Sequence, residues 1–418
     1  MAREYGTARR VVVIGAGIVG TACACWLARD GHAVTLVDRQ APGTATSFGN
    51  AGAISPGSIE PLGTPGMLWQ VPGWLLDPLG PLTVRWRHAL RLAPFLTGLV
   101  RASSPARVAR IAAELATYLP DALKAYEPLL AESRLGHLVR RDGMLWVFDS
   151  DAAFAKGQAS IALRRRYGVP VENVTGDAMR QMEPALAPDL RHAVFLPDVG
   201  RVVDPAGLVT GLAQHLQRRG GQVMRAAVHE VTFGSDGPDA IVTDRGTLPA
   251  DAIIVAAGAW SSTLARRLGS VVPLETERGY HVTIPDPKVA PRRMIQPHGQ
   301  GFLATPMTMG LRVAGTVELA SLEAAPDWRR AEVLLAKARR LFPGIDTANA
   351  TRWMGHRPSL PDSKPVIGRS PMHKNVFYAF GHGHLGLTGA AATGRHIGDL
   401  VAGRPTAIDL KPFAIDRF

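Results

Sequence analysis

The feature that most constrains this chain lies at residues 10–39, where the pattern changes from strand to turn to helix to strand. Residues 11–14 are all β-branched, which is typical of a strand buried in a parallel sheet. A turn at 15–20 with the pattern G-x-G-x-x-G follows directly, and apolar residues recur at helical spacing over 21–30. Residues 33–37 predict the next strand. Such a β-α-β unit is typical of a domain that binds a dinucleotide.

Each glycine of this turn has a distinct expected role. Gly15 permits the tight turn, Gly17 lets the backbone approach a pyrophosphate, and Gly20 allows the helix to pack closely on the strand. The free N–H groups and the positive dipole end of the helix then face the phosphates. The candidate cofactor residues of the turn are Gly15, Ala16, Gly17, Ile18, Val19 and Gly20.

Asp38 lies 18 residues after Gly20, at the end of the second strand, where a carboxylate accepts hydrogen bonds from ribose hydroxyls. We take Asp38 and the adjacent Arg39 as cofactor residues. The motif alone does not separate NAD from FAD. Its position near the start of the chain, with sheet segments far downstream, favours FAD. The small and hydroxyl residues of a second loop suit a pyrophosphate and a flavin, although a plain turn-rich loop has the same composition. Its candidates are Thr46, Ser47, Asn50, Ala51 and Gly52.

Strand and helix patterns alternate in some blocks and separate in others. This predicts an α/β Rossmann-type FAD-binding domain, built from discontinuous segments, with an inserted α+β substrate domain that has an antiparallel sheet. We expect residues 8–90, 204–266 and 351–418 in the FAD-binding domain, and residues 91–203 and 267–350 in the substrate-binding domain. Residues 40–81 are rich in Gly, Pro and Ser and predict a long ordered loop or lid, and residues 84–130 are expected to be largely helical.

Composition limits the class of protein. No apolar run approaches 18 residues, and residues 1–10 do not resemble a signal peptide, so we expect a cytoplasmic protein. The net charge is +12, but the arginines are scattered, which argues against nucleic-acid binding. Peripheral attraction to the inner face of a membrane, or to an acidic electron acceptor, stays open. The two cysteines, Cys23 and Cys25, do not form a metal-binding pattern, and no metal is expected.

Several blocks of the sequence resemble one enzyme family. The segments VVVIGAGIVG, VDR and TSFGNAGAISPG resemble the D-amino-acid dehydrogenases, within the broader group of D-amino-acid oxidase, glycine oxidase and sarcosine oxidase. Residues 253–261 are similar to the family's second FAD-contacting strand and turn. Residues 355–368 and 381–388 are similar to the block before the C-terminal flavin segment and to that segment itself. The likeness runs in the family's order from residue 11 to about 403.

The resemblance implies FAD as the cofactor, bound noncovalently because the C-terminal cysteine that links flavin in sarcosine oxidases is absent. Val228 is implied to meet the adenine. The helix that begins near Thr388 is implied to point its N-terminus at the flavin pyrimidine ring, where negative charge accumulates on reduction. The further cofactor residues implied in this way are Ala257, Gly258, Trp260, Gly381, His382, Gly383, Gly386, Leu387 and Thr388.

The resemblance also implies the substrate site. Arg357 matches the arginine that pairs with a substrate carboxylate, and a planar guanidinium suits this bidentate role. Pro358 and Gly355 are expected to hold it on a rigid loop. Tyr280 is expected to donate its hydroxyl to a carboxylate, with His281 lining the pocket and His384 beside the flavin. Packing in a strand, or a satisfied core histidine, is the competing reading for these three.

The expected reaction is oxidation of a small-molecule D-amino acid by hydride transfer to flavin N5. The strand motif around Tyr280 resembles enzymes for D-proline or cis-4-hydroxy-D-proline. The alternative is the flavin subunit of a multi-component amine or imino-acid dehydrogenase, or a glycine- or sarcosine-type oxidase. The electron acceptor is left open among oxygen, a quinone and a partner protein. Hydrolase chemistry has little support, because the chain has no GxSxG motif.

Overall fold

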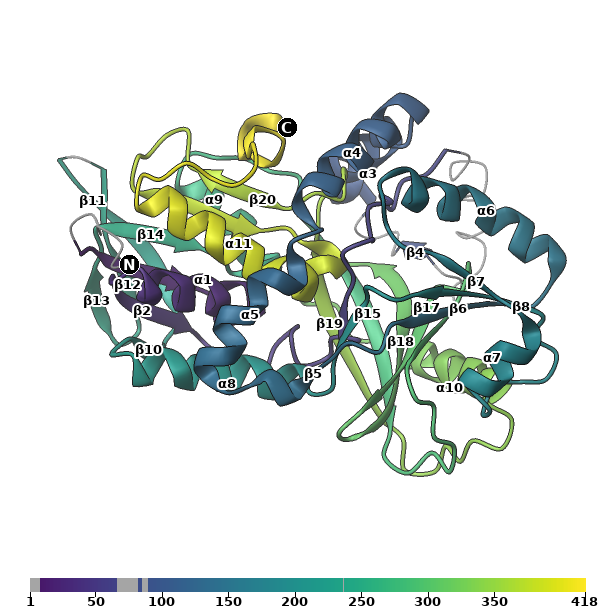
Figure 1. The fold of residues 1–418 in the computed structure, drawn as a ribbon. Coiled ribbons are helices and arrows are strands. Elements are labelled where there is room, and N and C mark those ends of the chain that lie inside the picture. Colours follow the sequence, from purple (N-terminus) through teal and green to yellow (C-terminus); the bar gives the residue numbers. More distant parts are fainter. Residues whose placement is uncertain (1–7, 66–81, 85–88, 236) are drawn as a thin grey trace.

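The computed structural model describes residues 8–65, 82–84, 89–235 and 237–418, and its first layer is a six-stranded sheet (Figure 1). The predicted β-α-β unit forms β1, α1 and β2, and β10, β14 and β21 extend the parallel ladder on its two sides. Strand β20 pairs antiparallel with β21 and closes one edge. The order is β10 (Gln222–Arg225), β2 (Ala33–Asp38), β1 (Arg10–Ile14), β14 (Ala252–Val255), β21 (Val376–Phe380) and β20 (Val366–Arg369).

Helices cover one face of this sheet. Helix α1 (Ile18–Arg29) packs between α11 (Gly386–Val401) and α8 (Pro205–Arg218), and α5 (Ala122–Ser133) packs on α11 (Figure 1). The other face is covered by a small antiparallel sheet and α9 (Ser261–Arg267), which share a hydrophobic cluster with β1 and β14. The strands of that small sheet are β11 (Val228–Gly234), β12 (Gly237–Thr243) and β13 (Gly246–Pro249). Both faces of the parallel strands are thus buried, as their continuous apolar runs predict.

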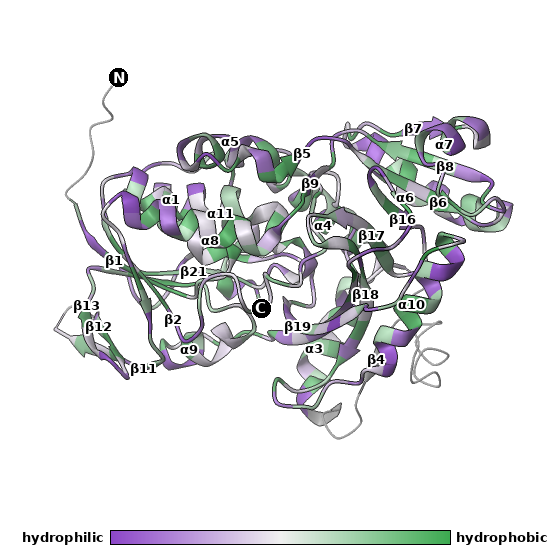
Figure 2. Ribbon diagram, turned by 90° about the horizontal axis from the view of Figure 1, so that it is seen from below, coloured by the Kyte–Doolittle hydropathy of each residue, from purple (hydrophilic) through white to green (hydrophobic). Residues whose placement is uncertain are grey.

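The second layer is a nine-stranded mixed sheet, with α10 (Arg329–Leu341) and α7 (Gly176–Met182) against one face. Helix α10 shows hydrophobic and hydrophilic residues side by side (Figure 2), as expected for a helix with one buried stripe. The strand order is β19 (Thr351–Ser359), β15 (Glu275–Ile284), β18 (Gly310–Leu319), β17 (Phe302–Met307), β16 (Met294–Pro297), β6 (Met144–Phe148), β8 (His192–Leu196) and β7 (Glu172–Val174), and β4 (Leu82–Val84) pairs with β18.

The remaining elements connect these layers. A three-stranded sheet joins β3, β9 and β5, and helices α3, α4 and α6 lie over the second sheet and its junction with the first (Figure 1). These elements are β3 (Ala53–Ile54), β5 (Val139–Arg140), β9 (Gly200–Val202), α3 (Ala89–Ala102), α4 (Pro105–Tyr118) and α6 (Asp151–Arg166). Short 3-10 helices cover Gly136–Leu138, Gly258–Trp260, Gly383–Leu385, Lys411–Phe413 and Ile415–Arg417. Of the predicted loop at 40–81, residues 66–81 lie outside the described residues.

Two segments differ from their expected placement. Residues 351–359, assigned to the FAD-binding domain with Arg357 on a rigid loop, form β19 and pair with β15 of the second sheet. The Gly and Pro residues of this segment are uncommon inside strands, so the sequence did not predict a strand here. Because β19 lies at the edge of the sheet, the missing N–H of Pro358 costs few ladder hydrogen bonds. Strand β4, expected in the first domain, also pairs with the second sheet. We retain the other boundaries as a proposal.

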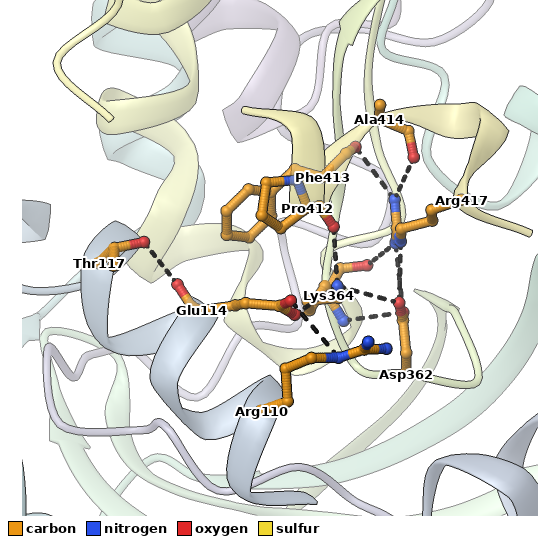
Figure 3. A network of polar contacts seen from close by, with 9 residues as sticks. All are labelled: Arg110, Glu114, Thr117, Asp362, Lys364, Pro412, Phe413, Ala414 and Arg417. Carbon is orange, nitrogen blue, oxygen red and sulfur yellow. Dashed lines mark hydrogen bonds and ion pairs between the residues drawn. The ribbon is translucent and has the colours of Figure 1, made fainter. Parts of the chain in front are cut away.

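A buried ionic network holds the chain just after β19 (Figure 3). The Lys364 ammonium, 5% exposed, donates to Glu114 on α4 at 2.6 Å and to the carbonyl of Pro412 at 2.7 Å. Arg417, near the C-terminus, pairs with Asp362 at 2.8 Å and donates to the carbonyl of Lys364 at 2.7 Å. The network joins α4, the turn after β19 and the C-terminal segment, so it fixes one end of the strand that carries Arg357.

Candidate active site

A cavity of about 910 Å³ lies between the two large sheets. Its walls come from the turn between β1 and α1, the ends of β2 and β14, the loop before β3, strands β15, β18 and β19, and the start of α11. The cavity falls at the upper end of the size range of small-molecule sites. The carboxyl ends of β1, β2 and β14 open into it, which is where open α/β sheets bind their ligands.

The turn after β1 has the geometry that its glycines predict. Gly15 has φ +114°, and a side chain there would overlap the carbonyl oxygen of Ala256. The amide of Ala16 donates to one oxygen of the Asp38 carboxylate at 2.8 Å, and the amide of Gln40 donates to the other at 2.8 Å. The amide of Ile18 donates to the Ser47 hydroxyl at 3.0 Å. These bonds hold Asp38 and the start of α1 at the cavity wall.

The predicted adenine end lies beyond Asp38. The Arg39 guanidinium stacks 4.3 Å from the centre of the Trp260 ring, and both side chains line the cavity. Val228, at the start of β11, also lines the cavity. This end is walled by one flat cation, one indole and small apolar residues, which suits a planar base.

Most predicted cofactor residues border this single cavity. They are Gly15, Gly17, Ile18, Val19, Asp38, Arg39, Thr46, Ser47, Asn50, Ala51, Val228, Ala257, Gly258, Trp260, His382, Gly383, Gly386, Leu387 and Thr388. Four others lie behind the wall: Ala16, Gly20, Gly52 and Gly381. Of these, Ala16 acts through its amide on Asp38, and Gly20 packs directly beneath Gly15.

The two histidines before α11 differ. His382 is 2% exposed, and its Nε2 lies 2.9 Å from the Thr393 hydroxyl, so it is a satisfied core histidine at the edge of the cavity. Its burial lowers its pKa to about 3. The His384 side chain instead has open surface inside the cavity. The surrounding cavity walls, which reduce its contact with solvent, and the charge of Arg357 lower its pKa to about 4, so His384 is neutral at physiological pH.

Arg357 enters the cavity from β19 and lies over Gly279 of the neighbouring strand, where a side chain would overlap the guanidinium. Its Nη1 donates to the carbonyl of Thr316 at 3.1 Å. Thr316 has φ +59° beside a register shift between β15 and β18, an uncommon conformation for a β-branched residue. Burial lowers the Arg357 pKa, and the charge of Glu277, its cross-strand partner, opposes this shift.

Glu277 is a site residue that the sequence pattern did not single out. It is 5% exposed, lines the cavity, and lies directly opposite Arg357 in the ladder. Burial raises its pKa, and Arg357 partly offsets that shift. The alternation of β15 contains the signal, since Glu277 and Gly279 share one face, but only the pairing with β19 shows what they face.

Tyr280 and His281 do not take their expected places. Tyr280 borders the cavity, but its hydroxyl points to the opposite face of β15, where it donates to Glu318 at 2.5 Å and accepts from the amide of Asp327. It packs there against α10. His281 does not border the cavity; its Nδ1 lies 3.1 Å from the Gly49 carbonyl and its ring stacks on Trp353. Adjacent strand residues point to opposite faces, so the Tyr280 hydroxyl and the His281 ring cannot point into the same space.

The cavity fits FAD. It offers a β-α-β turn for a pyrophosphate, a carboxylate for a ribose, and a helix N-terminus at α11 for a ring that gains negative charge. Gly49 and Ala51 also border it, and their amides have no acceptor among the described residues. Within the described part of the chain, no helix is long and apolar enough to span a bilayer.

The chain is similar to several known proteins. Residues 10–400 match the family described as "DAO: FAD dependent oxidoreductase". A D-amino-acid oxidase of Bradyrhizobium diazoefficiens is 40% identical over 98% of this chain and 99% of its own length. A D-amino acid dehydrogenase of Paramagnetospirillum magneticum is 34% identical, with the same coverage.

Solved structures show the same fold. Glycine oxidase from Geobacillus kaustophilus has a TM-score of 0.75 at 23% identity and covers 98% of this chain and 100% of its own. L-proline dehydrogenase from P. horikoshii has a TM-score of 0.73 at 18% identity, with coverage of 99% and 98%. The predicted Rossmann-type domain with a second sheet domain, and the predicted FAD cofactor, are therefore confirmed. The chain belongs to the DAO family of FAD-dependent oxidoreductases.

Proposed function

We propose that this enzyme oxidises a D-amino acid and that Arg357 binds the substrate carboxylate. The observation that carries the proposal is a guanidinium that enters the cofactor cavity with one backbone hydrogen bond and no ion pair among the described residues. A guanidinium in a fixed fork matches a carboxylate bidentately. The names of the relatives, D-amino-acid oxidase and D-amino acid dehydrogenase, support the substrate class.

Bound FAD supplies a two-electron acceptor for the hydride that leaves the substrate Cα. In this proposal the neutral amine becomes an iminium ion as the Cα–H bond breaks and the hydride leaves, and water later converts the iminium ion to a keto acid and ammonium. Arg357 orients the substrate, and neutral His384 offers a ring nitrogen to the amine side of the same space. The N-terminus of α11 favours the negative charge that the cofactor gains. Catalysis then rests on orientation, without a base at Cα.

Arg357→Met tests this role. We expect kcat/KM to fall by roughly a hundredfold or more, because a charge-assisted bidentate pair is lost, while FAD stays bound. Arg357→Lys keeps the charge without the fork and should recover part of the loss. Arg352→Met is the matched control, since Arg352 lies on the same strand but is exposed and stacks on Trp328. Equal kcat/KM for the Arg357 and Arg352 variants would remove Arg357 from the substrate site.

The substrate within this class is a further proposal. We propose a cyclic D-amino acid such as D-proline or cis-4-hydroxy-D-proline, for which the imine stays in the ring. This choice of substrate is supported by the resemblance of the strand motif around Tyr280, whose hydroxyl faces Glu318. An anaerobic panel of cyclic and acyclic D-amino acids, glycine, sarcosine and L-amino acids decides it. Faster bleaching by acyclic D-amino acids would refute the cyclic preference and leave the D-amino-acid class intact.

The electron acceptor separates the two enzyme types. We propose a dehydrogenase, supported by the relatives named D-amino acid dehydrogenase. We propose that FAD is bound noncovalently, since Cys23 and Cys25 are both buried in α1 and neither borders the cavity. The test is reoxidation of the substrate-reduced enzyme by air, by a soluble quinone and by a dye. Full dye turnover by the isolated chain with slow reoxidation in air supports a self-sufficient dehydrogenase. Turnover that appears only with co-purified partner proteins would instead support the flavin subunit of a larger assembly.

The location is proposed as cytoplasmic, with attraction to the inner face of the membrane through the net charge of +12. Sedimentation with vesicles that contain anionic lipid tests it. Binding that disappears in high salt or with neutral vesicles supports the proposal, and equal recovery in the supernatant with both vesicle types contradicts it.

A further inference from the structure

The loop that lies between β2 and β3 is held from one side by side chains of the second sheet. Arg312 on β18 donates from Nη1 to the carbonyl of Phe48 and to the carbonyl of Asn50, each at 2.9 Å. The carbonyl of Gly49, between these two, lies 3.1 Å from Nδ1 of His281. The Thr305 hydroxyl on β17 donates to the carbonyl of Ala51 at 2.8 Å. Four consecutive carbonyls thus point toward one sheet.

The planarity of the peptide bond fixes what the opposite side of the loop presents. In a trans peptide, the N–H of one residue points away from the carbonyl of the residue before it. The two carbonyls that Arg312 binds belong to the peptides whose N–H groups are those of Gly49 and Ala51. These two amides have no acceptor among the described residues, and both residues border the cofactor cavity.

Other amides of the loop are already used. The amide of Phe48 donates to Ala45, that of Asn50 to Ser47, and that of Gly52 to the side chain of Asn50. Along the loop, amides that donate hydrogen bonds within the protein therefore alternate with amides that have no acceptor among the described residues. Both residues are half-buried at the cavity wall, so a ligand that fills the cavity and excludes water is the expected acceptor for their amides.

We propose that Arg312 is a positioning residue for the cofactor: it holds two peptides of the loop so that the amides of Gly49 and Ala51 donate hydrogen bonds to bound FAD, and His281 fixes the peptide between them. His281, expected in the substrate pocket, thus acts on the cofactor loop. Neither residue needs to touch the cofactor itself.

The same face of the second sheet links this loop to the substrate site. On β15, His281 and Glu277 are four residues apart, so their side chains share one face. Across the ladder, His281 lies opposite Trp353 and Glu277 lies opposite Arg357. One rigid strand pair therefore holds the cofactor loop at one end and the candidate carboxylate site at the other.

The local charges favour this arrangement. Arg312 is 2% exposed, and its burial lowers its pKa to about 10, so it stays charged at neutral pH. Burial and the charge of Arg312 lower the pKa of His281 to about 3, so its ring is neutral and does not repel the guanidinium. A charged donor to two carbonyls forms stronger bonds than a neutral one.

The test is the rate at which FAD leaves the holoenzyme, followed by the rise of flavin fluorescence after dilution. Arg312→Met should speed FAD release by roughly tenfold to a hundredfold, because two charge-assisted hydrogen bonds to the loop are lost. Arg312→Lys should restore part of the affinity. His281→Leu should also speed release, and His281→Asn should speed it less, since its amide nitrogen takes a place close to that of Nδ1.

Two arginine variants serve as controls. Arg278 is a fully buried arginine on the other face of β15 that donates to the carbonyl of Ala324, and Arg340 is an exposed arginine on α10. Arg278→Met should lower stability without speeding FAD release from the folded enzyme, and Arg340→Met should do neither. The proposal is overturned if the Arg312 and Arg278 variants release FAD at the same rate, or if the Arg312 and His281 variants raise KM alone. The rates of FAD release do not depend on which amino acid is the substrate.

Discussion

At the scale of single residues, the position of the Arg357 side chain depends on the lack of a side chain at Gly279. The guanidinium of Arg357 occupies the space where a Cβ of residue 279 would lie. It reaches that space because Thr316, in a strained backbone conformation, turns its carbonyl to accept from Nη1. The arginine is therefore placed by two backbone features that carry no charge.

Gly279→Ala tests this placement. The added methyl group must displace the guanidinium, and we expect kcat/KM to fall by roughly tenfold to a hundredfold, mostly through KM, because misplacement of a binding group by about 1 Å has effects of this size. FAD content should be unchanged. Gly136→Ala is the control, since a Cβ there meets no atom within 4 Å. Kinetics of the Gly279 variant within about twofold of wild type would show that Arg357 has room to move without consequence.

At the scale of elements, the turn after β19 decides how firmly the strand is anchored. Lys364 and Arg110 both pair with Glu114, but the Lys364 side chain is 5% exposed and that of Arg110 is 65% exposed. The two pairs share one carboxylate and differ in burial, so they separate a structural ion pair from a surface one (Figure 3).

Lys364→Met should lower the free energy of unfolding by about 3 kcal/mol, because the Pro412 carbonyl loses its donor and Glu114 keeps only the longer contact with Arg110. Arg110→Met should lower it by less than about 1 kcal/mol, as for other exposed ion pairs. Denaturant unfolding of both variants measures the difference. Equal losses would mean that the network does not anchor the C-terminal segment.

The elements also show which parts of the fold can be predicted from a single sequence. The β-α-β unit was predicted to within a few residues, because apolar periodicity is a local signal. Strand β19 was missed because Gly355 and Pro358 interrupt its pattern, although an edge strand tolerates both. Among the site residues, the role of Arg357 was predicted from the family resemblance and not from a local pattern.

The contacts of Arg312 could not be predicted from any local sequence pattern. Its partners Phe48 and Asn50 lie 264 and 262 residues away in the chain, and the segment around it reads only as an alternating strand. For the same reason, the sequence placed Tyr280 and His281 in one pocket. Strand alternation sends them to opposite faces, and only the neighbours of β15 decide which face meets the cavity.

At the scale of the whole molecule, burial of histidines affects stability in acid. His281, His382 and His396 are each 2% exposed or less, and burial lowers their pKa values to about 3, 3 and 4. An unfolded chain binds protons at these residues below about pH 6.5, whereas the folded protein does not until about pH 4. The unfolded state therefore gains stability as the pH falls through this window.

We expect the free energy of unfolding to decrease between pH 6.5 and pH 4, by about 1.4 kcal/mol per pH unit for each of these histidines. Denaturant unfolding at several pH values measures this slope. His396→Gln should make the slope shallower by about one histidine's share, provided that the fold is kept. A stability that stays constant from pH 7 to pH 4.5 would contradict the burial of these rings as neutral groups.

The cavity is lined by the parallel sheet and by the sheet that carries Arg357, and we propose that a D-amino acid reacts there. The most direct measurement is anaerobic bleaching of the flavin absorbance by the two enantiomers of one amino acid, in wild type and in Arg357→Met. The account predicts rapid bleaching of the wild type by the D-enantiomer, little by the L-enantiomer, and slow bleaching of the variant. Faster bleaching by the L-enantiomer, or equal bleaching of both proteins, would contradict it.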